Sequence, residues 1–172
     1  MLLRHAELPI TRWRNGAGRK ADVVSGPGWF IGFAWLDGPA DFSHYEGQDR
    51  TITLLRGNGF ALDFAEGPPL LVDRPQVPSP FDGGRACRCR LLDGPCLVVN
   101  AVSDRARYRH RVEIRIPRPE DTGFAVLLSG SATLPDGRIA QPLDTVALPL
   151  ALDVTCAVFH FTPLGIPEPF AA

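Results

Sequence analysis

The stretch DGPADFSHYEGQDRTITLLRG, residues 37–57, has the spacing of a metal-binding motif found on small β-barrels. The motif begins at Gly38, continues through His44 and Glu46 and ends at Gly57. Strand-like alternation through this stretch would direct its spaced side chains into one cavity. An arginine, Arg50, stands where the third metal ligand belongs. The stretch therefore predicts a barrel, and it raises the question of what the arginine does there.

Composition narrows the class of protein. The chain has 172 residues and is 45% hydrophobic, which predicts a single domain with a sizeable core. A net charge of -1 gives no argument for nucleic acid or for an anionic membrane as partner. No run approaches the roughly 20 apolar residues of a membrane span, and no secretory signal opens the chain. The four cysteines form no CxxC pair. We expect a reduced, cytoplasmic protein.

Turn residues divide the chain into short segments. It contains 17 glycines and 17 prolines, and the segments between them are rich in β-branched and aromatic residues. No window keeps a helical period beyond two turns. This pattern favours an all-β sandwich or barrel.

Two similar stretches suggest an internal duplication. T-L-L-R-G at residues 53–57 and V-L-L-S-G at residues 126–130 each predict a strand, a glycine turn and a returning strand. Matches this short also arise by chance among hairpins. We predict one domain over residues 1–172, with an N-terminal half at 1–103 that holds a pocket and a C-terminal half at 112–172.

The connector between the halves is rich in arginine. Residues 104–111 read DRARYRHR, and on a strand the alternating arginines would share one face. They could form a phosphate-binding or nucleic-acid-binding edge, but a solvated connector is the favoured interpretation. A homodimer through this edge is left open.

The ligand set of the motif favours an anion over a metal. His44, Glu46 and Cys96 could in principle converge on a divalent ion. A permanent cation at Arg50 would repel that ion by several kcal/mol, on the order of the Coulomb energy in a low-dielectric cavity. We therefore expect no metal and no cofactor. A guanidinium instead matches a carboxylate or a phosphate, although a structural salt bridge to Asp49 is the alternative role.

A second distinctive stretch is WRNGAG, residues 13–18, whose glycines could expose backbone N–H groups to an anion. Together with F-S-x-x-x-G-x-D-R, F-D-G and L-L-D-G-P…N, it is similar to the HutD/Ves family, a bicupin-like group encoded with histidine-utilisation enzymes in many bacteria. The matching positions are Trp13, Asn15, Gly16 and Gly18; Phe42, Ser43, Gly47, Asp49 and Arg50; Phe81, Asp82 and Gly83; and Leu91 to Pro95 with Asn100.

The resemblance implies a bicupin-like fold of two small antiparallel β-barrel or jelly-roll halves packed together. It implies a non-catalytic protein that regulates histidine utilisation by binding a small anionic metabolite such as N-formylglutamate or formate. The pocket wall is then expected from the residues Asn15, Gly16, Gly18, Ser43, Arg50 and Asn100. His44 is a further candidate for ligand binding because its ordinary pKa lies near neutrality, but its position varies in the family, which favours a rim or surface histidine. This chain departs from the family pattern at Lys20, Asp22 and Glu46, which leaves the identity of the ligand open.

Two other functions remain as alternatives. A metal-independent enzyme, an isomerase or a hydrolase, could use His44, Glu46 or Cys96. A protein-interaction module with a vestigial pocket is the third interpretation. The resemblance itself favours binding and assigns no catalytic residue.

Overall fold

The computed structural model describes residues 1–13 and 16–165, which form strands with one short 3-10 turn, η1 (His5–Glu7). A six-stranded sheet, here the central sheet, has the order β2-β3-β4-β11-β6-β9 and only antiparallel pairs. Its strands are β2 (Thr11–Arg12), β3 (Gly18–Gly26), β4 (Trp29–Leu36), β6 (Gln48–Arg56), β9 (Pro78–Asp82) and β11 (Cys96–Asp104).

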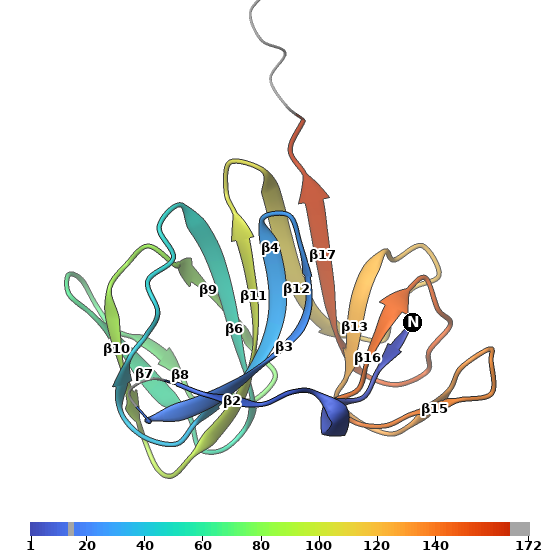
Figure 1. Ribbon diagram of the computed structural model, residues 1–172, viewed down its shortest axis with the longest axis horizontal. Helices are drawn as coiled ribbons and strands as arrows, with labels where there is room; N and C mark the ends of the chain where they lie inside the picture. The colour runs from blue at the N-terminus through green and yellow to red at the C-terminus, as the bar shows by residue number, and fades with distance from the viewer. Residues whose placement is uncertain (14–15, 166–172) are drawn as a thin grey trace, which may run out of the picture.

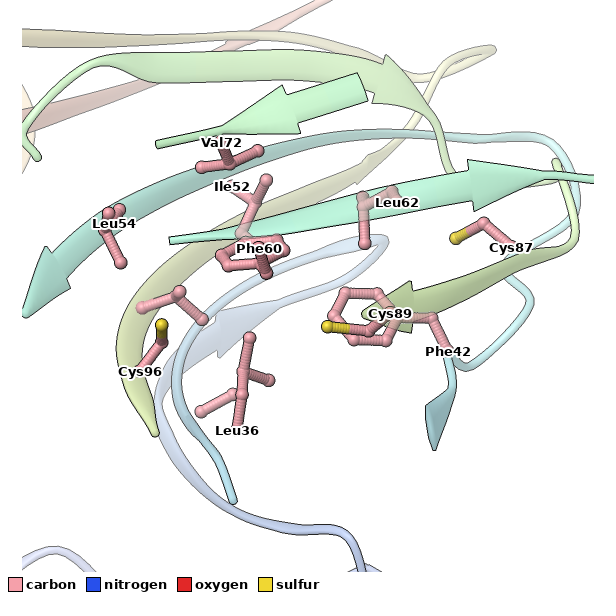
Figure 2. Close-up of a cluster of buried hydrophobic side chains, with 12 residues drawn as sticks. Leu36, Phe42, Ile52, Leu54, Phe60, Leu62, Val72, Cys87, Cys89 and Cys96 are labelled. Atoms are coloured by element: carbon pink, nitrogen blue, oxygen red, sulfur yellow. The ribbon is translucent and has the colours of Figure 1, made fainter. Parts of the chain in front are cut away.

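A four-stranded sheet, the outer sheet, faces the central sheet (Figure 1). Its order is β5-β10-β7-β8, with β5 (Ala40–Asp41), β7 (Phe60–Phe64), β8 (Leu70–Val72) and β10 (Cys87–Leu91). Alternating side chains of the two sheets, among them Ile52, Leu54, Phe60 and Leu62, fill the space between them, as Figure 2 shows. Burying this apolar surface is what holds the two sheets face to face.

A five-stranded sheet, the C-terminal sheet, covers the other face of the central sheet (Figure 1). Its order is β1-β16-β13-β17-β12, with β1 (Leu2–Leu3), β12 (Tyr108–Arg115), β13 (Gly123–Leu127), β16 (Thr145–Leu148) and β17 (Cys156–Pro163). A ribbon of β14 (Ala132–Thr133) and β15 (Ile139–Ala140) completes a further core on its far side. Ile31 and Phe33 of the central sheet pack with Ala157 and Phe159 in one shared core.

The prediction of an all-β, jelly-roll-like chain is confirmed. The boundary of the halves differs from the expected 1–103, because Leu2 and Leu3 pair with β16 and so belong to the C-terminal sheet. The two glycine turns also differ from simple hairpins. After Gly57 the chain enters the outer sheet as β7, and after Gly130 it enters the β14–β15 ribbon, so each turn carries the chain into another sheet.

No helix within residues 1–13 and 16–165 combines the length and the apolar character needed to cross a bilayer.

Candidate functional site

A cavity of about 490 Å³ opens over the face of the central sheet that meets the segment after β5. This volume lies within the usual range for small-molecule sites. Aromatic side chains form much of its wall, namely Trp13, Phe30, Phe42 and Tyr45. The polar residues that line it are Arg12, Lys20, Asp22, Asp41, Ser43, Arg50 and Asn100.

Arg50 and Asn100 form the buried polar centre of this cavity. They lie on the adjacent strands β6 and β11, in a register that pairs Asn100 with Ile52. Because side chains two apart on a strand share a face, Arg50 and Asn100 emerge on the same side. Arg50 donates to Asn100 Oδ1 from Nε at 3.0 Å and from Nη2 at 2.9 Å. Arg50 is only 8% exposed and Asn100 only 6%.

The charge of Arg50 has no carboxylate partner among the described residues. Asp49, the neighbour considered as a partner, belongs to the opposite face and pairs with Arg105 at 3.0 Å. Burial lowers the pKa of Arg50, although a guanidinium stays protonated at neutral pH. An uncompensated buried cation is costly, so the cavity favours an anion beside Arg50.

Three aromatic rings surround the guanidinium. Its central carbon lies 4.8 Å from the ring centroid of Phe42, 5.4 Å from that of Phe81 and 5.6 Å from that of Tyr45. The faces of these rings attract a cation without neutralising it. They therefore hold Arg50 in place and leave its charge available.

Both central residues keep donors that no other described residue accepts from. Arginine has five N–H donors and no acceptor, so Asn100 must present its oxygen to Arg50 and keep its amide nitrogen for another partner. Within the described part of the chain, neither Arg50 Nη1 nor Asn100 Nδ2 makes a hydrogen bond, and neither atom is sealed from the cavity. A carboxylate could accept hydrogen bonds from both.

The structure brings together three of the predicted pocket residues, Ser43, Arg50 and Asn100. It does not bring His44 into the cavity, because His44 is exposed and its ring contacts the backbone carbonyl of Gly84. Asn15 lies outside the described residues.

The two predicted glycines shape the wall from behind. A Cβ on Gly18 would lie 2.6 Å from the carbonyl oxygen of Trp35 and 3.0 Å from the ring of Trp13, so only glycine permits this packing. Gly16 has a φ of 71° and donates its amide to the carbonyl of Trp13 at 3.0 Å. Neither glycine lines the cavity, but both place Trp13, which does.

Sequence reasoning missed the ring of Phe81 beside Arg50 and the carboxylate of Asp41 at the rim, whereas it singled out Lys20 and Asp22 as departures from the family pattern. Phe81 pairs with Arg50 across β6 and β9, a relationship that only the register reveals. At the rim, Lys20 pairs with Asp22 at 3.3 Å, and Asp41 pairs with Arg88 at 3.1 Å.

The residues of the enzyme alternative do not converge. His44 and Glu46 are exposed, whereas Cys96 lies in the core between the central and outer sheets, with its thiol directed to the carbonyl of Gly59 (Figure 2). Burial raises the pKa of the Cys96 thiol, which disfavours the reactive thiolate. Residues 1–13 and 16–165 contain no cluster of three or more His, Cys, Asp or Glu side chains that could hold a metal ion.

Known proteins resemble the chain in sequence and in fold. An uncharacterised 21.2 kDa protein in the hutC 3' region of Pseudomonas putida is 31% identical over 122 residues, which span 65% of this chain and 62% of that protein. Protein Ves of Citrobacter koseri is 28% identical over 115 residues, 63% of this chain and 60% of Ves. The chain thus spans about three fifths of the length of these relatives.

A solved structure, that of HutD from Pseudomonas fluorescens SBW25, superposes with a TM-score of 0.83 over 96% of this chain and 99% of that one. At 20% identity this likeness shows a shared fold. The HutD family model matches residues 5–139, a segment that contains Arg50, Asn100 and their aromatic neighbours. The chain therefore belongs to the HutD family.

Proposed function

We propose that this chain is a non-catalytic binding protein that takes a small anionic metabolite into the Arg50 cavity. The proposed ligand is a carboxylate such as N-formylglutamate or formate, and its binding serves a regulatory role in histidine utilisation. The observation that carries the proposal is the buried guanidinium of Arg50, which faces a cavity and has no carboxylate partner among the described residues. A carboxylate there would form charge-assisted hydrogen bonds with a prepositioned donor.

One relative supports the biological setting. The Pseudomonas putida relative is a protein of the hutC 3' region. The proposed setting is the cytoplasm, with neither nucleic acid nor a membrane as partner, in keeping with the net charge of -1.

The lining favours binding over catalysis. The described residues that line the cavity include no histidine and no cysteine. Its two carboxylates, on Asp22 and Asp41, are exposed and each is paired with a cation. The cavity is also lined by Ser43, but within the described residues no hydrogen bond joins its hydroxyl to a carboxylate or a histidine, the arrangement of nucleophile and base that covalent catalysis requires.

A ligand screen tests this function. Thermal unfolding is measured with sodium formate, N-formylglutamate, glutamate, urocanate and imidazolonepropionate, each with and without EDTA. A ligand at 100 times its Kd should stabilise the fold by about 2.7 kcal/mol. We expect a carboxylate to do so in the wild type and not in Arg50→Met, which keeps an unbranched apolar side chain and removes the charge.

The matched control is Arg90→Met, because Arg90 is exposed on the outer sheet and pairs with Asp63. This variant should bind as the wild type does. Absence of binding by every carboxylate, or equal binding by Arg50→Met, would overturn the proposal. Loss of stability on chelation would indicate a metal, and conversion of a ligand detected by mass spectrometry would indicate an enzyme.

A further inference from the structure

The arginine-rich connector contains a residue, Arg105, that joins several segments adjacent to the cavity wall. Residues 105–107 form the turn between β11 and β12. From this turn, Arg105 donates to the carboxylate of Asp49 at 3.0 Å and to that of Asp82 at 2.6 Å. It also donates to the backbone carbonyl of Gln48 at 3.2 Å, and its own amide donates to the carbonyl of Gly47 at 3.1 Å.

The two carboxylates that Arg105 contacts lie one position away from Arg50 and Phe81 along their strands. Asp49 and Asp82 are register partners on β6 and β9, and the adjacent partners are Arg50 and Phe81. Arg105 therefore fastens the two strands one position away from the guanidinium and one of its rings. Its hydrogen bond also lowers the pKa of Asp82.

The segment that carries Tyr45 is tied to the same place. The amide of Tyr45 donates to the carbonyl of Gly83 at 2.8 Å, and the amide of Gly83 donates to the carbonyl of Gln48 at 2.9 Å. Because Arg105 contacts Gly47, Gln48 and Asp82 from outside, it closes this set of bonds into one unit. Tyr45 lines the cavity and is a second ring around Arg50.

We infer that Arg105 is a positioning residue for anion binding: it fastens residues 45–49 to the end of β9 and thereby holds Tyr45 and Phe81 around Arg50. It also offsets part of the negative charge of Asp49 and Asp82, which would otherwise oppose an incoming anion more strongly. The inference rests on the proposed function for the effect on binding, whereas the fastening of the wall stands on the contacts alone.

Two measurements on Arg105→Gln test the inference. Amide hydrogen exchange of residues 43–49 and 81–85 measures the local stability of the cavity wall in the absence of ligand. Isothermal titration with sodium formate measures the affinity of the Arg50 cavity for an anion. We expect local exchange to rise and formate affinity to fall, each by about three- to tenfold, as fits the loss of exposed ion pairs. Arg105→Lys keeps the positive charge but lacks the paired N–H donors of a guanidinium. Its exchange rates and its formate affinity should therefore lie between those of the wild type and Arg105→Gln.

Arg138→Gln is the matched control, because Arg138 is equally exposed and pairs with Asp136 in a distant turn. It should leave both measurements unchanged. Unchanged exchange in Arg105→Gln would overturn the inference, as would wild-type formate affinity in that variant. If the wild type binds no anion, the proposed function fails, and the exchange measurement still decides whether Arg105 holds the wall.

Discussion

Arg50 donates two hydrogen bonds to one oxygen of Asn100, and both residues are buried at the base of the cavity. Asn100 is a neutral acceptor. An aspartate of the same shape would have formed a bidentate ion pair and neutralised the guanidinium. An asparagine orients Arg50 just as well and leaves its positive charge for a ligand.

Asn100→Asp should weaken anion binding strongly without unfolding the protein. The new carboxylate would occupy the same volume and compensate the buried cation, so formate affinity should fall by about tenfold or more while the melting temperature stays equal or rises. Isothermal titration and thermal melts measure the two effects. Asn58→Asp is the matched control for affinity, because it adds the same charge at an exposed position; its new carboxylate would face Asp93, so only its stability should fall. Wild-type affinity in Asn100→Asp would contradict this account of the site.

Gly18→Ala should damage the cavity wall more than Gly16→Ala does. A Cβ at Gly18 would collide with backbone and with the ring of Trp13, whereas a Cβ at Gly16 meets nothing within 4 Å. Gly16 still has a positive φ, so its replacement should cost about 1 kcal/mol. We expect Gly18→Ala to cost more and to weaken formate binding as well. Denaturant unfolding and titration compare the pair, and equal effects would show that the packing of Trp13 does not matter.

Two of the predicted pocket residues that line the cavity lie on regular strands, whereas Ser43 and His44 lie between strands, where Ser43 lines the cavity and His44 does not. Arg50 and Asn100 lie on long strands, β6 and β11, so alternation places them correctly. His44 lies between the end of β5 at Asp41 and the start of β6 at Gln48. Since that segment is not a strand, its side chains do not alternate, and His44 turns to Gly84.

Other features depend on pairing between distant segments. Phe81 reaches Arg50 only because β9 joins the edge of the central sheet in one particular register. Similarly, Leu2 and Leu3 pair with Val146 and Thr145, which no local pattern in the first few residues indicates. Local periodicity predicts strands, but it does not predict which strands become neighbours.

His110 should make stability depend on pH. Its ring bridges the hydroxyls of Thr51 at 2.9 Å and Ser103 at 2.7 Å, and burial lowers its pKa from the ordinary 6.5, against a smaller opposing effect of Asp49. The unfolded chain therefore gains a proton at a higher pH than the folded chain. Stability is full above about pH 6.5 and falls as the pH falls below it, by at most about 1.4 kcal/mol per pH unit.

Melting temperatures measured between pH 5 and 8 test whether stability falls as the pH is lowered. Burial also lowers the pKa of His5, so both histidines contribute in the same direction. His110→Gln should flatten the profile below pH 6.5, and adding His5→Gln should flatten it further. A profile that stays as steep in the double variant would assign the pH dependence to other groups.

The three layers of the chain should unfold together. Phe159 of the C-terminal sheet is 1% exposed and packs with Ile31 and Phe33 of the central sheet, while Phe60 is fully buried between the central and outer sheets. Each Phe→Ala change should cost about 3–5 kcal/mol. Because the central sheet belongs to both cores, each variant should lower the melting temperature of a single unfolding transition that all three sheets share.

Calorimetry distinguishes this from independent halves. In the wild type, Phe60→Ala and Phe159→Ala alike, we expect a single transition whose calorimetric and van't Hoff enthalpies agree. If the halves were independent, Phe159→Ala would instead lower only a separate C-terminal transition and leave the Arg50 cavity folded and able to bind formate. Since β1 pairs with β16 and the chain then continues into the central sheet, the first residues connect the two halves, and melting one should expose the core of the other.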